Sequence, residues 1–202
     1  ADHTGAGGAI STRGGTGISL ERVLDEAEER AATVIAQKNP DLANAKEVAR
    51  MVGLGALKYF DLSHHLKSDI IFEWDRALSF EGNTGPYLQY THARLKSILR
   101  KAGSEIRDVS NAGLDPLEHN LVVAILRLPE AIEDALKDYT PNILANYLFS
   151  LAQLANEFYH SHPVMQETDE NKKNLRLVLV AAAASALKKG LYLLGIDAPE
   201  EM

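Results

Sequence analysis

The chain has 202 residues, of which 46% are hydrophobic and 24% are charged, a balance typical of a folded protein with a substantial core. It contains no cysteine, which excludes disulfide bonds, thiolate nucleophiles and thiolate metal ligands. The net charge of −7 argues against a protein that binds nucleic acid over its whole surface, and no apolar run is long enough to span a membrane.

Two helices are predicted in the first third of the chain. Apolar residues recur at helical spacing over residues 20–35, where Ser19 is a suitable N-cap and Pro40 stops the pattern. A second helix is expected over residues 48–60. Residues 70–74 read as a short extended segment, but nothing nearby is suited to be its strand partner.

A glycine-punctuated loop at residues 79–85 leads into Pro86, which suits the first position of a helix over residues 86–102 that Gly103 would end. The first turns of this helix carry Tyr87, Gln89, Tyr90, His92 and Arg94. Ring faces beside a guanidinium are suited to an unstacked nucleic-acid base. The alternative is an ordinary helix start whose two tyrosines are half buried in a core.

Proline residues divide the rest of the chain into helices. Pro116, Pro129 and Pro141 each open a helical segment, and residues 172–194 form a last helix that Gly195 ends. Helices with prolines at their starts and short joints between them are typical of an antiparallel bundle. The predicted fold class is therefore all-α, a helical bundle.

Basic residues gather in two stretches, and each is either a surface for an anionic partner or a solvated helix face. The first comprises Arg94, Lys96, Arg100, Lys101 and Arg107, and the second Lys172, Lys173, Arg176, Lys188 and Lys189.

Neither pair of neighbouring histidines, His64 with His65 or His160 with His162, has a carboxylate at an established ligand spacing, so we predict no metal site. No Ser/His/Asp arrangement stands out either, and we predict no catalytic residue.

Several strings along the chain resemble those of arginyl-tRNA synthetases. Residues 52–62 read VGLGALKYFDL and residues 72–90 read FEWDRALSFEGNTGPYLQY, and both are close to strings of that family. Residues 11–14, STRG, are similar to the end of its KMSTRxG signature loop, and residues 193–196, LLGI, followed by Met202, are similar to its terminal string. The matches are collinear, and they resemble the C-terminal portion of the family.

The resemblance implies a chain in two parts. After a leader or cloning remnant at residues 1–10, residues 11–82 would hold the end of the signature loop and the stem-contact helices. Residues 83–202 would form the all-helical anticodon-binding domain, called the DALR domain. The chain would be the tRNA(Arg)-binding portion of an arginine–tRNA ligase, which uses ATP and Mg²⁺ to activate arginine and then esterifies it to tRNA.

The implied partners are tRNA(Arg) and the catalytic domain of the same enzyme, and the implied state is a cytoplasmic monomer without membrane contact. The nucleic-acid-binding residues carried over are Asn83, Tyr87, Gln89, Tyr90, Arg94 and Met202. Tyr87 would stack near the anticodon, Arg94 would contact the loop, and Met202 would reach the same site. Leu88, Ala93 and Leu95 would pack inward. Ser11, Thr12 and Arg13 would be a remnant of the ATP-site loop.

The chain also departs from the family. It contains no HIGH motif, and Ala9-Ile10 stand where Lys-Met is expected, so a lysine that would compensate phosphate charge is missing. We therefore expect the chain alone to be inactive. The alternative function is a helical scaffold that docks a protein partner without binding RNA, since a net charge of −7 suits protein contact as well.

Overall fold

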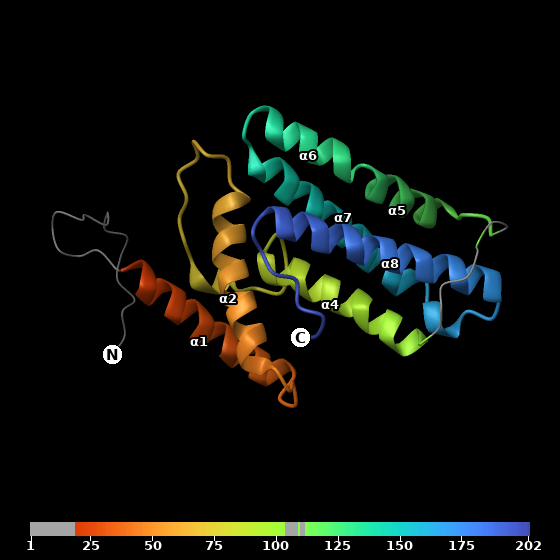
Figure 1. The fold of residues 1–202 in the computed structure, drawn as a ribbon, viewed down its shortest axis with the longest axis horizontal. Coiled ribbons are helices and arrows are strands. Elements are labelled where there is room, and N and C mark those ends of the chain that lie inside the picture. Colours follow the sequence, from red (N-terminus) through yellow and green to blue (C-terminus); the bar gives the residue numbers. More distant parts are fainter. Residues whose placement is uncertain (1–18, 104–108, 110–111) are drawn as a thin grey trace.

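The computed structural model describes residues 19–103, 109 and 112–202, and Figure 1 shows their arrangement. Over these residues the chain forms helices and no strand, so the all-α prediction is confirmed. No helix in this part of the chain has the length and hydropathy that a membrane crossing requires. The predicted leader and the signature-loop residues Ser11, Thr12 and Arg13 lie outside the described residues.

The first two helices form a pair at one end of the molecule (Figure 1). Helix α1 runs over Leu20–Lys38 and helix α2 over Ala45–Leu62, and the Ser19 hydroxyl accepts a hydrogen bond from the N–H of Arg22 as the predicted N-cap. The pair encloses a small apolar core of its own, formed by Ala31, Ile35, Leu42, Val48, Ala49, Val52, Ala56 and Leu78.

The remaining long helices form the bundle. Helices α4 (Gly85–Ala102), α7 (Pro141–Ser161) and α8 (Glu170–Leu193) pack side by side, and α5 (Pro116–Leu126) and α6 (Leu128–Lys137) lie along their outer side (Figure 1). Leu88, Leu95, Leu148, Leu177 and Leu187 are among the buried residues of a larger core between them. Apolar residues at helical spacing thus form the core between these helices, as predicted.

Helix ends follow the predicted signals with small differences. Gly103 has the left-handed backbone (φ 56°) expected of a C-terminal cap. Pro86 is the second helical residue and not the first, because Thr84 is the N-cap and its hydroxyl accepts from the N–H of Tyr87. The last helix begins at Glu170, two residues before its predicted start, because the Asp169 side chain caps it.

Two short helices were not predicted from the sequence. Helix α3 spans Trp74–Ala77 and the 3-10 helix η2 spans Val164–Gln166. Residues 70–73 form no strand, in agreement with the absence of a partner, and Trp74 begins α3.

Helices α2 and α4 approach closely where two glycines meet. A Cβ atom on Gly85 would lie 2.6 Å from the carbonyl oxygen of Gly55, which is too close for any real side chain. The glycines of the strings at residues 52–62 and 72–90 therefore fix where α4 begins, and with it the side chains of its first turns.

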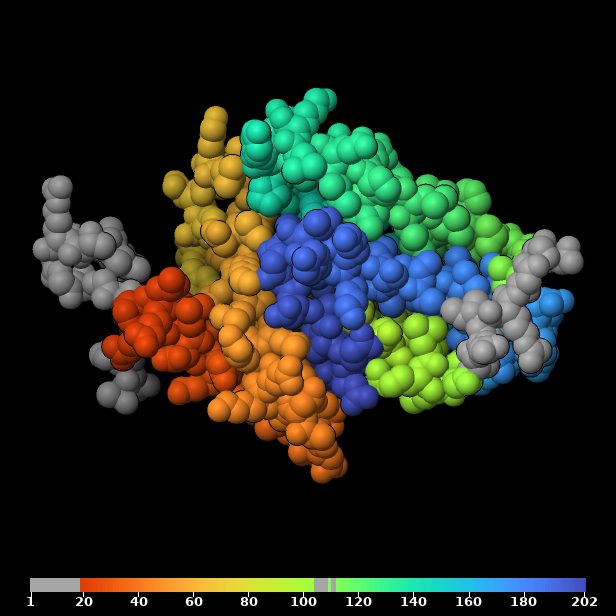
Figure 2. Space-filling model, in the orientation of Figure 1, coloured from red at the N-terminus to blue at the C-terminus, as the bar shows by residue number. Residues whose placement is uncertain are grey.

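After α8 the chain reverses at Gly195, whose positive φ of 70° favours glycine. Residues 196–202, here called the strap, then run alongside α4, whose side chains bond to three of their carbonyls. Figure 2 shows the strap in dark blue between α2 and α4. Ile196 is buried in the bundle core, whereas Met202 packs against the core of the α1–α2 pair. The strap thus spans both apolar cores.

Candidate nucleic-acid interface

A groove of about 580 Å³ lies along α4, between the end of α7 and the strap. Its lining includes Tyr90, Arg94, Lys101, Tyr159, His160 and Met202. We call it the α4 groove. Three of the six nucleic-acid-binding residues that the resemblance implies line this groove: Tyr90 and Arg94 from α4, and Met202 from the strap.

The centre of the groove is a guanidinium held between two aromatic rings. The Arg94 guanidinium carbon lies 4.7 Å from the ring centroid of Tyr90 and 5.3 Å from that of Tyr159. Its Nη1 donates a 2.8 Å hydrogen bond to Oδ1 of Asn156 on α7. Cation–π contacts and the hydrogen bond fix the guanidinium in one orientation, so a ligand would meet an ordered cation.

Tyr87 is joined to this arrangement through Asn156 and does not line the groove. The Asn156 amide nitrogen donates to the Tyr87 hydroxyl and to the Thr91 hydroxyl, each at 2.9 Å. The Tyr87 ring packs edge-on against Phe149. Tyr87 is half-buried, and its hydrogen bond shows that it helps to orient Asn156.

A second hollow, of about 360 Å³, adjoins the α4 groove, and Asn39, Tyr90 and Met202 line both. Its other walls are the end of α1 and Phe80, whose ring packs edge-on against Tyr90. The ammonium of Lys38 lies 5.1 Å from the Phe80 ring centroid. Aromatic faces and cations therefore continue from α4 onto the α1–α2 pair.

The prediction that Gln89 faces a nucleic acid is wrong. Its side chain is fully buried, and its amide nitrogen donates to the carbonyls of Met51 and Asp197. His92 is fully buried too, and its Nδ1 lies 2.9 Å from the carbonyl oxygen of Pro199. Burial lowers the pKa of His92, while the hydrogen bond to Pro199 acts in the opposite direction. The strap covers this face of α4.

Leu88, Ala93 and Leu95 are buried, as predicted.

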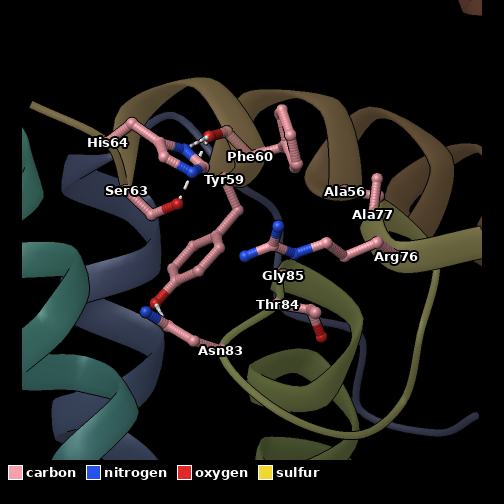
Figure 3. A pocket seen from close by; sticks show the side chains of 10 residues that line it. All are labelled: Ala56, Tyr59, Phe60, Ser63, His64, Arg76, Ala77, Asn83, Thr84 and Gly85. Atoms are coloured by element: carbon pink, nitrogen blue, oxygen red, sulfur yellow. Dashed lines mark hydrogen bonds between the residues drawn. The ribbon is translucent and has the colours of Figure 1, made fainter. Parts of the chain in front are cut away.

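Asn83 lies at the start of α4, in a different hollow of about 230 Å³ that Figure 3 shows. Its Oδ1 accepts a 2.6 Å hydrogen bond from the Tyr59 hydroxyl, which also contacts the carbonyl of Ala145, and its Nδ2 donates to Oδ1 of Asn146. Burial raises the pKa of Tyr59, so this hydroxyl keeps its proton. Asn83 therefore connects α2 to α7 and is not part of the α4 groove.

The two predicted basic stretches differ in what they face. Arg94, Arg100 and Lys101 of the first line the α4 groove, where the single acidic lining residue, Glu201, pairs with Arg100. In the second stretch, Lys172 and Arg176 form ion pairs with the buried carboxylate of Glu118.

Burial alone would raise the pKa of Glu118, but the hydrogen bonds from Lys172, the Asp115 backbone and Arg176 hold it below its usual value. The positive charges of the second basic stretch are therefore largely paired with carboxylates of the same chain.

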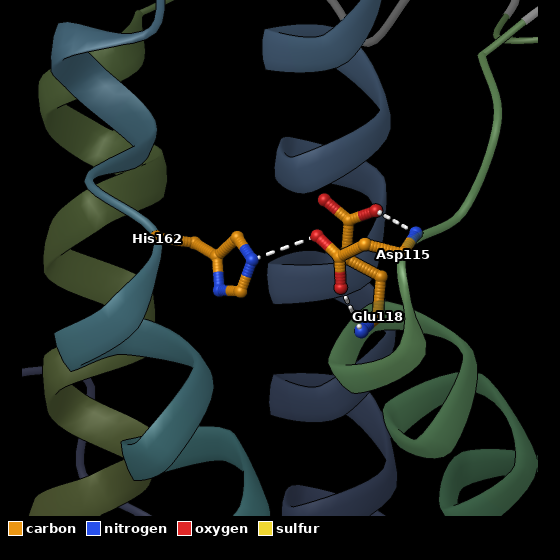
Figure 4. Close-up of side chains that lie close together, drawn as sticks. All are labelled: Asp115, Glu118 and His162. Atoms are coloured by element: carbon orange, nitrogen blue, oxygen red, sulfur yellow. Dashed lines mark hydrogen bonds and ion pairs between the residues drawn. The ribbon is translucent and has the colours of Figure 1, made fainter.

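One group of metal-capable side chains occurs among the described residues: Asp115, Glu118 and His162, whose candidate ligand atoms lie within 4.8 Å of one another (Figure 4). Their atoms already have partners. Asp115 caps α5 and contacts Nε2 of His162 at 2.8 Å, while Glu118 binds Lys172 and Arg176. An ion here would displace two cations, and the arrangement fits a structural ion-pair network.

Several residues of the interface were not predicted from the sequence, among them Tyr159, Asn156, Lys38 and Phe80. Each meets α4 from a helix or loop elsewhere in the chain, and no local pattern signals such a pairing. The tyrosine and the asparagine are three positions apart on α7, a spacing that also suits an ordinary helix face.

Two family models match the chain. The model described as "DALR anticodon binding domain" matches residues 88–202, and the model described as "tRNA synthetases class I (R), catalytic domain" matches residues 4–74. The first match covers more than half of the chain and contains every lining residue of the α4 groove except Asn39.

Among similar proteins is an arginine–tRNA ligase of Alkaliphilus metalliredigens, 45% identical over 201 residues, which cover 98% of this chain and 35% of that protein. An arginine–tRNA ligase of Fusobacterium nucleatum is 42% identical over 98% of this chain and 36% of its own length. The chain thus spans about a third of the length of these relatives.

Solved structures give the same picture. The arginyl-tRNA synthetase of Thermus thermophilus superposes with a TM-score of 0.86 and 43% identity, over 92% of this chain and 32% of that one. The enzyme of Plasmodium falciparum superposes with a TM-score of 0.79 and 29% identity, over 92% of this chain and 34% of that one.

Proposed function

The chain belongs to the family of DALR anticodon-binding domains, and on this premise we propose that it binds the anticodon loop of tRNA(Arg) as part of an arginine–tRNA ligase. The complete ligase would activate arginine with ATP and esterify it to the tRNA. This chain would supply tRNA recognition and not catalysis, in keeping with its coverage of about a third of the similar ligases.

The observation that carries the proposal is the Tyr90–Arg94–Tyr159 arrangement at the centre of the α4 groove. Aromatic faces bind unpaired bases by stacking, which contributes about 1–3 kcal/mol per base. Arg94, Arg100 and Lys101 would attract the phosphates of the same loop, and that attraction weakens with salt. Met202 would pack its thioether against a base face.

The six residues carried over from the resemblance take different parts in this proposal. Tyr90, Arg94 and Met202 would touch the RNA, and Tyr87 would act through Asn156 by orienting Arg94. The buried Gln89 is excluded from RNA contact, and Asn83 is assigned to the joint between α2 and α7.

We extend the proposal to the organisation of the chain. Residues 11–82 would link the catalytic domain to the anticodon-binding domain at residues 83–202, and the interval between the two family matches, residues 75–87, supports a division there. The partners would be tRNA(Arg) and the rest of the ligase, in a cytoplasmic monomer. ATP and Mg²⁺ would be bound by the ligase's catalytic domain, and we assign none of the described residues to either.

A titration of the tRNA(Arg) anticodon stem-loop tests the proposal. Arg94→Lys should weaken binding about tenfold, because an ammonium replaces the planar group that fits between two rings and reaches Asn156. Arg127→Lys is the matched control, since Arg127 is an exposed residue that pairs with Glu130 away from the groove. Equal affinities of both variants and the unaltered protein would contradict the proposal.

Two further outcomes bear on the function. A protein-docking scaffold would show no stem-loop binding at low or physiological salt, whereas the proposed interface loses affinity steeply between them. ATP–pyrophosphate exchange catalysed by this chain alone would contradict the assignment of catalysis to the rest of the ligase.

A further inference from the structure

The strap has no regular structure of its own, so its backbone depends on side chains from elsewhere. Gln89 donates to the carbonyl of Asp197 at 2.7 Å, and His92 donates to that of Pro199 at 2.9 Å. Arg100 donates to the carbonyl of Glu200 at 2.8 Å. Three carbonyls of the strap therefore accept hydrogen bonds from side chains spread along α4, and these bonds fix the strap's direction along that helix.

In addition to these backbone hydrogen bonds, the side chain of Glu200 forms ion pairs with lysines of two helices. Its Oε1 lies 3.0 Å from Nζ of Lys188 on α8, and its Oε2 lies 3.0 Å from Nζ of Lys96 on α4. We call this arrangement the Glu200 clasp. Burial alone would raise the pKa of Glu200, but the hydrogen bonds from Lys188 and Lys96 lower it. The carboxylate is therefore charged at neutral pH and holds both lysines.

The clasp lies two residues before Met202, which lines both hollows of the interface. The main chain of Met202 is held weakly, by a 3.3 Å hydrogen bond from the Asn39 side chain to the Met202 carbonyl, and its side chain only packs against the core of the α1–α2 pair. The position of the Met202 side chain beside Phe80 and Tyr90 therefore depends on the contacts that fix the preceding residues of the strap. Neither Lys96 nor Lys188 lines the α4 groove.

From these contacts we propose that Lys96 and Lys188 are positioning residues, which hold the Met202 side chain in the RNA-binding groove through Glu200. The part of this inference that concerns RNA binding rests on the proposed function. The part that concerns the position of Met202 can be tested on the protein without RNA. Exposed ion pairs contribute little to stability, and these side chains are 31–57% exposed, so the effect expected of the clasp is one on position.

The structural readout uses the methionine methyl groups. The chain has three methionines, Met51, Met165 and Met202, so a protein with ¹³C-labelled methionine methyls gives three NMR signals. The Met202 signal should be shifted by the rings of Phe80 and Tyr90. In the Lys96→Gln/Lys188→Gln double variant, which adds no methionine, it should move toward the position of a free methionine, while the other two signals stay. Lys189→Gln, on the same helix beside Lys188, is the matched control and should change none of the three.

RNA-binding measurements distinguish an effect of Glu200 on the position of Met202 from an effect of its negative charge on the RNA. Glu200→Ala removes a negative charge near the groove, so electrostatics alone predicts tighter binding of the anticodon stem-loop. The clasp predicts weaker binding, by about fivefold, as in Met202→Ala, the low end of what one base contact contributes. In the Glu200→Ala background, Met202→Ala should cause no further loss.

The results distinguish failure of the clasp from failure of the function. An unmoved Met202 signal in the double variant, or fully additive losses for Glu200→Ala and Met202→Ala, would overturn the inference. Absence of stem-loop binding by the unaltered protein would overturn the proposed function, and the NMR experiment would still decide whether the clasp holds Met202.

Discussion

Arg94 and Asn156 lie 62 positions apart in the sequence and are joined by a 2.8 Å hydrogen bond across the α4–α7 contact. The asparagine has no freedom to turn, because its Nδ2 donates to the hydroxyls of Tyr87 and Thr91. Its Oδ1 must then face the guanidinium. A network of neutral side chains thus sets the direction of the cation that we place at the centre of the interface.

Asn156→Ala should therefore weaken RNA binding although Asn156 need not touch RNA. The variant loses three hydrogen bonds, which should lower the free energy of unfolding by about 1–3 kcal/mol. Stem-loop affinity should fall by about fivefold as Arg94 loses its orientation. Denaturant unfolding and RNA titration measure the two effects. Ser150→Ala on the same helix, whose hydroxyl donates to the Asn146 carbonyl one turn earlier, is the control and should leave both nearly unchanged.

The buried carboxylate of Glu118 should dominate the acid sensitivity of the bundle. Glu118→Gln leaves Lys172 and Arg176 without their shared counter-ion and should cost about 3–5 kcal/mol at neutral pH. Its pKa in the folded protein is below the usual value of 4.5, so its stabilising contribution is complete above that pH and is lost as the pH falls through the folded-state pKa.

The difference between the unaltered protein and Glu118→Gln in denaturant unfolding should thus shrink from pH 7 toward strongly acidic pH. Glu130→Gln removes an exposed partner of Arg127 and should cost less than about 1 kcal/mol at any pH. A difference that does not change with pH would contradict the assigned role of Glu118.

Tyr139 is the one non-glycine residue with a positive φ, 54°, in the described part of the chain, and its side chain is 81% exposed. It joins α6 to α7 at a cost of about 1–2 kcal/mol in backbone strain. Tyr139→Gly should raise the free energy of unfolding by about 0.5–1 kcal/mol, because glycine adopts this conformation freely and little burial is lost.

The same substitution at an exposed tyrosine within a helix should act in the opposite direction. Tyr192→Gly, near the end of α8, should lower stability by about 1 kcal/mol. Thermal or denaturant unfolding of the pair gives the comparison, and a loss of stability in both variants would show that the backbone at Tyr139 is unstrained.

Gly85→Ala should damage the joint between α2 and α4. The added methyl group would meet the Gly55 carbonyl oxygen at 2.6 Å, and backbone cannot move aside as a side chain can. We expect a loss of about 1–3 kcal/mol in denaturant unfolding. Ala substitution of Gly113, around which a Cβ would find open space, should be nearly neutral and is the control.

Most of the helices could be predicted from the sequence, because their apolar spacing, prolines and caps are local signals. The start of α5 is an example, since Pro116 opens the helix as predicted, and the structure adds a capping box formed by Asp115 and Glu118. Helix α3 was missed because four residues are too few to show a period.

The interface was only partly predictable, because what covers or completes it comes from distant segments. Gln89 and His92 lie on the first turns of α4 as expected, but the strap, more than 100 positions later, buries them. Tyr159 completes the groove from α7, and Lys172 is neutralised by Glu118 from α5. A single sequence carries no local sign of any of these pairings.

The most direct test of the account compares two RNA hairpins with the same stem. One carries the tRNA(Arg) anticodon loop and the other a closed tetraloop without unpaired anticodon bases. In a fluorescence titration at physiological salt, we predict binding of the anticodon hairpin, weakened by Arg94→Lys, and little binding of the tetraloop hairpin. Equal affinity for both hairpins would contradict the claim that the α4 groove receives the anticodon loop.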